Sequence, residues 1–100
     1  MKECKNIEEI RENIDSIDKE IVKLLSQRSN FVKQAAKFKK NNEDIEAPQR
    51  VEEVIKKVKT LAVRYEMPPE IAENVYRVMI ENFINSETEE FKEKNLKNEF

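Results

Sequence analysis

Two cationic side chains interrupt an apolar stripe in the N-terminal half of the chain. Apolar residues recur at three- and four-residue steps from residue 7 to residue 38, the spacing that keeps side chains on one helix face. Arg28 occupies a position of that stripe, and Lys39 lies at its far edge. On one continuous helix, the two side chains would leave the same face about 16 Å apart. Their long side chains could then hold a small dianion between them.

Two interpretations of these cations are open from the residues alone. In the first, Arg28 and Lys39 bury their methylene stems and keep their charged groups in water. In the second, Arg28 faces inward because its guanidinium fork binds a carboxylate. Arg11 lies about 25 Å before Arg28 along a helix, so the two could share a small ligand only across two chains. By itself, Arg11 also fits a solvated charge paired with Asp15.

A carboxylate continues an apolar face in the C-terminal third of the chain. Met79, Phe83 and Glu87 follow one another at four-residue steps, so a helix would place Glu87 one turn beyond two apolar side chains. A carboxylate there needs a cation or a proton if it is buried. Alternatively, the helix already emerges into solvent at this point. Arg50 fits an anion contact and a surface charge equally well.

The composition excludes several classes of site. The 100-residue chain contains no glycine and no histidine, which excludes a P-loop, a dinucleotide fingerprint and histidine-dependent triads. We therefore expect neither a metal nor a cofactor. The net charge of −2 gives no basis for binding nucleic acid or an anionic membrane. A single cysteine, Cys4, and the lack of a signal-like or 18-residue apolar stretch lead us to expect a cytoplasmic protein.

Three helices account for most of the chain, so we expect one all-α domain over residues 1–100. The predicted helices run from about Ile7 to Lys40, from near Pro48 to Pro68, and from Pro69 to about Phe91. Asn6 followed by Glu9 resembles a capping box at the first start. Residues 41–44 are predicted to be a polar loop, and the tail after about residue 91 is expected to fray.

The length of the first predicted helix indicates a homodimer. A helix from residue 7 to residue 40 would span about 50 Å, whereas a 100-residue domain has a radius of gyration of about 13 Å. The rest of the chain is too short to cover the whole apolar stripe. A second copy would cover it if the two long helices packed antiparallel about a two-fold axis.

Four segments carry a resemblance to a known family. They are Ile-Arg-Glu-Asn-Ile-Asp-Ser-Ile-Asp at 10–18, Leu-Leu-Ser-Gln-Arg at 24–28, the run from Val32 to Lys39, and Ala-Pro-Gln-Arg-Val at 47–51. Together they resemble the all-helical (type II) chorismate mutases, over about residues 5–91. The resemblance implies an intertwined dimer of three-helix subunits, with two active sites that are each built from both chains and use no cofactor.

The resemblance also implies roles for single residues. Arg28 and the Arg11 of the partner subunit would hold the two carboxylates of the substrate, and Arg50 would be a further substrate contact. Lys39 would contact a carboxylate and the ether oxygen of the enolpyruvyl bridge, and Glu87 would donate a hydrogen bond to that oxygen. The reaction, from chorismate to prephenate, is a pericyclic rearrangement within one molecule. Catalysis needs the reactive conformer held and the charge on the ether oxygen stabilised.

Three positions depart from the typical bacterial mutase. Val51 and Ala47 stand where a Glu and an Asp contact the substrate's ring hydroxyl, and Phe83 replaces a Ser. All three make the predicted pocket more apolar, so Val51 and Phe83 are expected to line the substrate site. They resemble a sister branch, the isochorismate pyruvate lyases, which form salicylate and pyruvate by a related pericyclic step.

The sequence supports two enzymatic functions and one that is not enzymatic. We place the mutase first because prephenate is a general requirement for making phenylalanine and tyrosine, and the lyase a close second because of the apolar pocket. A helical dimerisation module would account for the stripe and the composition, but not for Arg28 and Lys39 aligned on one face. The expected partners are a small dicarboxylate and a second copy, with neither nucleic acid nor membrane.

Overall fold

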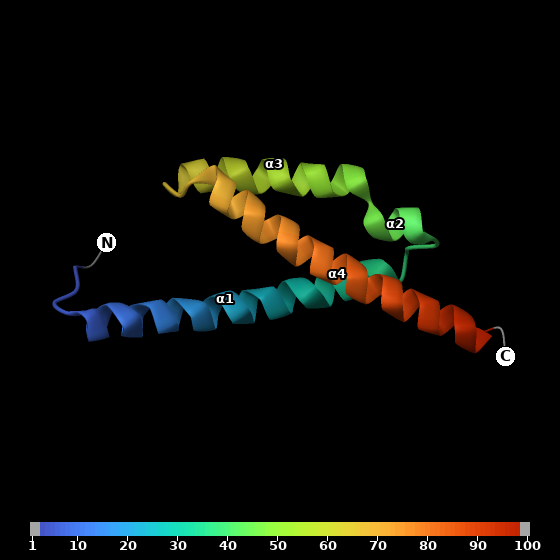
Figure 1. Ribbon diagram of the computed structural model, residues 1–100, viewed down its shortest axis with the longest axis horizontal. Coiled ribbons are helices and arrows are strands. Elements are labelled where there is room, and N and C mark those ends of the chain that lie inside the picture. The colour runs from blue at the N-terminus through green and yellow to red at the C-terminus, as the bar shows by residue number, and fades with distance from the viewer. Residues whose placement is uncertain (1–2, 99–100) are drawn as a thin grey trace. The chain divides into compact units, whose positions relative to one another are not determined.

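The computed structural model describes residues 3–98, with side chains from 3 to 94. Its helices are α1 (Ile7–Ala36), α2 (Asn42–Glu46), α3 (Pro48–Arg64) and α4 (Pro69–Asn98) (Figure 1). The all-α class with three long helices is confirmed for this part of the chain, and α2 is an additional short helix. Contacts within the chain divide it after Lys37 into two compact units, one that contains α1 and one from Phe38 onward. No helix between residues 3 and 98 is long and apolar enough to cross a membrane.

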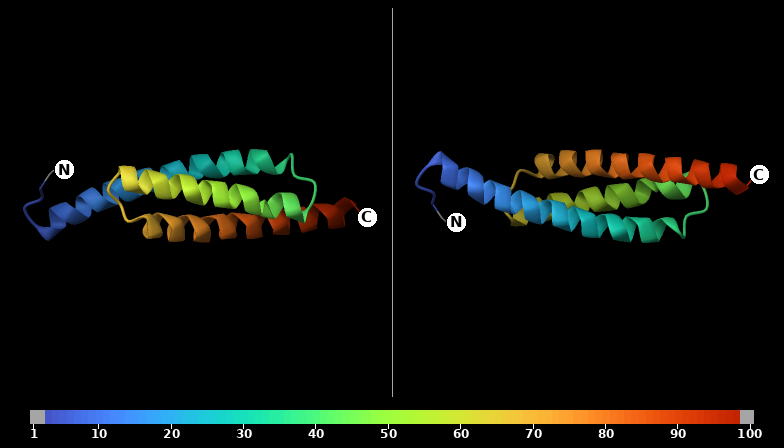
Figure 2. Two further views of the ribbon diagram at one scale, coloured as in Figure 1. Left: turned by 90° about the horizontal axis from the view of Figure 1, so that it is seen from above. Right: turned by 90° about the horizontal axis from the view of Figure 1, so that it is seen from below.

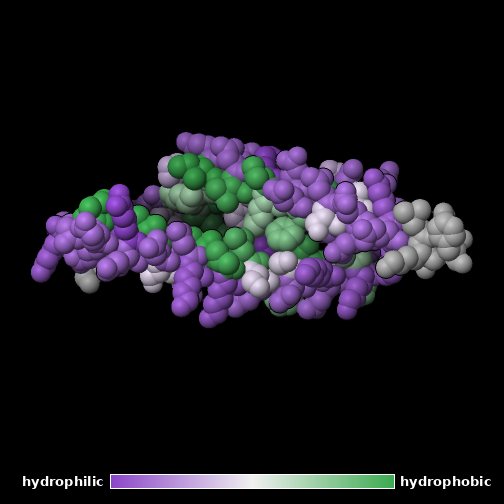
Figure 3. Space-filling view, turned by 60° about the horizontal axis from the view of Figure 1, so that its bottom comes forward, coloured by the Kyte–Doolittle hydropathy of each residue, from purple (hydrophilic) through white to green (hydrophobic). Residues whose placement is uncertain are grey.

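Helix α1 begins as the sequence predicts but buries none of its side chains. The Asn6 Oδ1 accepts a hydrogen bond from the Glu9 N–H at 2.8 Å, and the Glu9 carboxylate accepts one from the Lys5 N–H at 3.2 Å. The apolar stripe between Ile7 and Leu25 is 38% to 59% exposed. Apolar side chains are visible at the surface among charged ones in the space-filling view (Figure 3). A stripe this apolar on a solvent-exposed helix is typical of a surface that packs against a partner.

Helix α1 ends at Ala36, four residues earlier than predicted. The Lys37 N–H donates to the Gln34 carbonyl at 3.2 Å, a three-residue bond that tightens the last turn. The Lys40 N–H donates to the Asp44 carboxylate at 2.9 Å instead of to a carbonyl of α1. Lys39 therefore lies outside the helix. The prediction that Arg28 and Lys39 share one helix face was wrong.

The segment predicted to be a polar loop contains helix α2. Its Asn41 is the N-cap, and the Asn41 Oδ1 accepts from the Asp44 N–H at 2.9 Å. The helix contacts α4 and buries the side chain of Ile45. Ala47 ends α2 in the left-handed region, with φ 37° and ψ 59°, immediately before α3 begins at Pro48. The polar side chains of this segment thus cap a helix rather than prevent one.

Helices α3 and α4 lie side by side and antiparallel, and they form the core of the segment from residue 38 to residue 98 (Figure 2). The buried core residues are Val58 and Ala62 of α3 and Ala72 of α4, with Val54 and Tyr76 packed against them. Ile55 is also buried. Leu61 and Tyr65, near the end of α3, are exposed.

The turn between these helices begins earlier than the prolines predicted. Helix α3 ends at Arg64, and Glu66 adopts a positive φ of 59°. The Glu66 N–H donates to the Val63 carbonyl at 3.2 Å, and the Met67 N–H donates to the Ala62 carbonyl at 2.8 Å. These two bonds form a Schellman motif, which ends the helix before Pro68.

Helix α4 extends to Asn98, beyond the end near Phe91 that the sequence predicted, and the expected fraying of this tail stays a prediction. Its residues from Glu87 to Lys94 are rich in Glu and Lys, which are strong helix formers. Half-buried apolar side chains recur along its middle at Met79, Ile80, Phe83 and Ile84. This face is the one that the four-residue spacing predicted.

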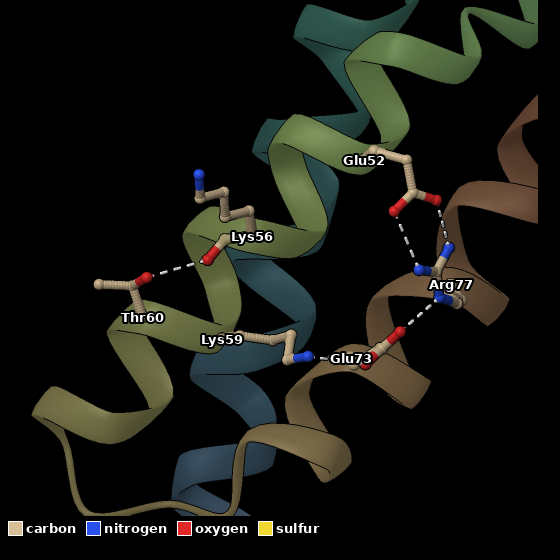
Figure 4. Close-up of polar contacts among 6 residues, drawn as sticks. All are labelled: Glu52, Lys56, Lys59, Thr60, Glu73 and Arg77. Atoms are coloured by element: carbon tan, nitrogen blue, oxygen red, sulfur yellow. Dashed lines mark hydrogen bonds and ion pairs between the residues drawn. The ribbon is translucent and has the colours of Figure 1, made fainter.

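An exposed network of ion pairs joins α3 to α4 near the turn (Figure 4). The Arg77 guanidinium donates to both carboxylate oxygens of Glu52, at 3.0 and 3.2 Å, and to Glu73 at 2.8 Å. Lys59 contacts Glu73 at 3.4 Å. The hydrogen bonds from Arg77 lower the pKa of the Glu52 and Glu73 carboxyls, and those with Glu52 and Glu73 raise the pKa of Arg77. This network joins the exposed surfaces of α3 and α4.

Candidate active site

Lys39 and Glu87 meet although 48 positions of sequence separate them. The Lys39 Nζ donates to the Glu87 Oε2 at 2.9 Å, and the two side chains are 22% and 10% exposed. Both residues belong to the segment from residue 38 onward. The structure therefore brings together the two side chains that the sequence singled out as catalytic.

Glu87 is positioned by the regular face of α4. It follows Phe83 by one helical turn and Met79 by two, and all three side chains are half-buried. Of the two alternatives drawn from the sequence, the structure favours a carboxylate paired with a cation over one already in solvent. A charge held away from water is tolerated when it has an oppositely charged partner.

The short segment between α1 and α2 positions Lys39. Lys39 directly precedes Lys40, whose backbone N–H donates to the Asp44 carboxylate. Because α2 contacts α4, the segment is held near the helix that carries Glu87. Sequence analysis missed this role of Asp44 and Ile45. The signal was present, since Asn41 followed three residues later by Asp44 is itself a capping pattern.

The Lys39–Glu87 pair can bind an anion that offers a hydrogen-bond acceptor to the Lys39 ammonium. A lysine ammonium carries three N–H donors, and the bond to Glu87 uses one of them. The others can reach a carboxylate or an ether oxygen that gains negative charge. A partly dehydrated ammonium stabilises such charge far better than an ammonium in bulk water.

The other predicted contacts in this part of the chain differ in exposure. Arg50 is exposed, and its Nη1 lies 3.6 Å from the Glu53 Oε2 on the same helix, so it forms a surface ion pair in the free chain. Val51 is half-buried at the start of α3, and Phe83 is half-buried on α4. Phe83 lies on the face that leads directly to Glu87.

The two remaining predicted residues, Arg11 and Arg28, both lie on α1. Arg11 is exposed and Arg28 is half-buried. The helix between them is continuous, which separates their Cα atoms by about 25 Å along its axis. One chain therefore does not bring Arg11 and Arg28 to the same small ligand. No group of three or more Cys, Asp or Glu residues among those described could hold a metal ion.

Comparison with known proteins decides the family. Residues 10–88 match the family described as chorismate mutase type II. The chain belongs to this family. All seven predicted site residues lie within the matched range, and the sequence resemblance is thereby confirmed.

Two curated relatives of this type II chorismate mutase family member have different activities. The chain is 45% identical over 49 residues to an isochorismate pyruvate lyase of Pseudomonas aeruginosa. This match covers 49% of the chain and 48% of the lyase. The chain is also 33% identical over 75 residues to a bifunctional chorismate mutase/prephenate dehydratase of Buchnera aphidicola. This second match covers 74% of the chain and 20% of that enzyme. The matches thus span about half of the first relative and a fifth of the second.

Proposed function

We propose that this chain is a chorismate mutase that rearranges chorismate to prephenate. The observation that carries the proposal is the half-buried Lys39–Glu87 pair, at 2.9 Å, in a chain of the type II chorismate mutase family. The rearrangement breaks an ether C–O bond and forms a C–C bond within one molecule. It requires no nucleophile, so a cation and a hydrogen-bond donor at the ether oxygen are sufficient.

The resemblance assigns each residue a role, and the charge of each side chain suits that role. Lys39 stabilises the negative charge that develops on the ether oxygen as its bond breaks. Glu87 can donate to the same oxygen only when it is protonated, because an ionised carboxylate is an acceptor alone. Arg28 and Arg11 of the partner subunit hold the two substrate carboxylates, and Arg50 leaves its surface pair to add a contact.

A second copy of the chain completes this proposed site. The exposed apolar stripe of α1 supports a dimer, since two such helices would cover each other's stripe. In an antiparallel pair, Arg11 of one subunit approaches the middle of its partner's α1, near Arg28. Two sites, each built from both chains, would result.

The isochorismate pyruvate lyase reaction is the second candidate. Two observations favour it: the apolar residues at positions 47, 51 and 83, and the 45% identity to a lyase over 49 residues. The same cations would serve both reactions, because both break the ether bond of a closely related dianion. We keep the mutase first because prephenate is a general requirement for making phenylalanine and tyrosine, whereas salicylate is a specialised product.

Assays of the purified chain on chorismate and on isochorismate test the proposal. We expect prephenate formation that falls about 10²–10³-fold in Lys39→Ala, the usual effect of removing one charge-stabilising group. Lys40→Ala, which removes the exposed neighbouring ammonium, should keep the activity. A mutase rate near background beside strong salicylate release would make the lyase the main activity. No turnover, together with no rise in Tm on adding a dicarboxylate transition-state mimic, would favour the dimerisation module.

A further inference from the structure

The segment that carries Lys39 has no apolar anchor of its own. Phe38, the adjacent residue, is 83% exposed, whereas the Lys39 side chain is only 22% exposed. Lys39 lies between the end of α1 at Ala36 and the start of α2 at Asn42. Besides its ion pair with Glu87, its position is therefore set by the contacts that follow it in sequence.

A pair of reciprocal hydrogen bonds fixes the chain directly after Lys39. The Asn41 Oδ1 accepts from the Asp44 N–H, and the Asp44 Oδ2 accepts from the Lys40 N–H, both at 2.9 Å. The peptide unit that ends in the Lys40 N–H begins at the Lys39 carbonyl carbon. Binding this N–H therefore restricts the backbone rotation that decides where the Lys39 side chain points.

Helix α2 connects this cap to the helix that carries Glu87, because α2 contacts α4. Ile45 of α2 is only 3% exposed. Asp44 and Ile45 are adjacent on α2, so the cap is fastened to the core of its segment. Two sets of contacts therefore join the Lys39 segment to α4: the packing of α2, which carries Asp44, and the ion pair of Lys39 with Glu87.

We propose that Asp44 is a positioning residue, which holds Lys39 ready for the anionic substrate by clamping the Lys40 backbone. The inference rests on the proposed function, because it concerns the substrate-binding state of Lys39. Losing the clamp lowers the fraction of chains whose Lys39 is in place before substrate arrives. Apparent affinity falls by that fraction, whereas the bound substrate itself holds Lys39 once it is seated. KM should rise while kcat changes little.

Three variants in the full chain test the clamp. Asp44→Ala removes the acceptor, and we expect KM to rise about fivefold, the effect typical of a lost cap, with kcat within about twofold. Asp44→Asn keeps an oxygen that can accept from the Lys40 N–H, so it should recover most of the loss. Glu43→Ala removes an exposed carboxylate of the same helix and controls for charge. A fall in kcat with KM unchanged, or an Asn variant as impaired as the Ala variant, would overturn the proposal.

A second readout works without turnover. Acetylation of Lys39 by a small acylating reagent, followed by peptide mass spectrometry, measures how firmly this side chain is held. Its rate should rise about fivefold in Asp44→Ala and at least as much in Ile45→Ala, with no change in Glu43→Ala. Lys40, already exposed, serves as the internal reference. An unchanged Lys39 rate in Asp44→Ala refutes the clamp. If the chain turned over neither substrate, the proposed function would fail while this rate still decided the clamp.

Discussion

Helix α1 and the α3–α4 pair are amphipathic elements of one chain, but they differ in where their apolar faces lie. The α3–α4 pair buries Val58, Ala62 and Ala72 in its own core, and surface ion pairs join its two helices. In contrast, α1 has 30 residues and no buried side chain. The first region closes its own core, whereas the second presents a stripe that nothing in the single chain buries.

This contrast separates two roles of apolar patterning. On α3 and α4, the pattern holds a scaffold that carries Glu87 and, through α2, positions Lys39. On α1, the same kind of pattern stays exposed, and Arg11 and Arg28 lie 17 residues apart on a continuous helix. The proposed dimer gives this arrangement a purpose, because only two chains could bring Arg11 and Arg28 to one ligand.

The largest effect is expected from a charge placed in the α1 stripe. Ile17→Asp would place a carboxylate in the proposed dimer interface, where its dehydration is costly, so we expect loss of the dimer and of activity. Val22→Asp is the matched control, because Val22 is exposed on the same helix about 120° around from Ile10. Light scattering and turnover measure the outcome. If the two variants behaved alike, the stripe would not be an interface.

The next largest effect concerns the scaffold's own core. Val58→Ala should lower the free energy of unfolding by about 1–3 kcal/mol, since it removes two buried carbons from the core of the α3–α4 pair. Val63→Ala on the exposed face should change it by less than about 0.5 kcal/mol. Urea denaturation followed by circular dichroism distinguishes them. Equal effects of the two variants would mean that this pair lacks the independent core described above.

A smaller effect is expected at Glu87, the functional end of the same scaffold. Because only the protonated acid can donate to the ether oxygen, mutase activity should rise as the pH falls, by at most about tenfold per pH unit. Glu87→Gln donates at every pH, so its profile should be flatter. Profiles of kcat measured for both proteins test this. A Gln variant with the same acid-favoured profile would assign the dependence to another group.

The smallest effect is expected at the exposed network. Arg77 lowers the pKa of Glu52 and Glu73 below the ordinary value of 4.5, so their stabilisation is present above that pH and is lost as the pH falls through the folded-state values. Arg77→Gln should therefore reduce Tm slightly at neutral pH and less below about pH 4, and less again in high salt. Lys57→Gln, an exposed lysine of α3, controls for charge. A Tm difference that grew in acid would contradict this account.

Much of the fold could be predicted from local signals. The Asn6 cap, the two prolines at the starts of α3 and α4, and the four-residue spacing on α4 were correct because each acts within one or two turns. The errors came from polar residues with a second role. Asn41 and Asp44 are typical of a loop but here cap α2, and Glu66 takes a left-handed position that glycine usually occupies.

The candidate site could be predicted residue by residue but not as a geometry. Lys39 and Glu87 each drew attention as a polar interruption of an apolar pattern, and the family resemblance assigned both to one oxygen. Their ion pair at 2.9 Å joins positions far apart in sequence. The spacing of apolar residues along a helix does not predict such a contact. The prediction placed Lys39 on the long helix, whereas α1 ends at Ala36 and the Lys40 N–H donates to the Asp44 carboxylate.

Subunit exchange between two inactive variants tests the central claim most directly. Arg11→Ala and Arg28→Ala should each lose most activity alone, because each removes one carboxylate contact from both proposed sites. After equal amounts are mixed and exchanged, half of the dimers are mixed and each contains one intact site. The account predicts recovery of about a quarter of the parent activity. No recovery, with exchange verified by mass spectrometry, would contradict a site shared between two chains.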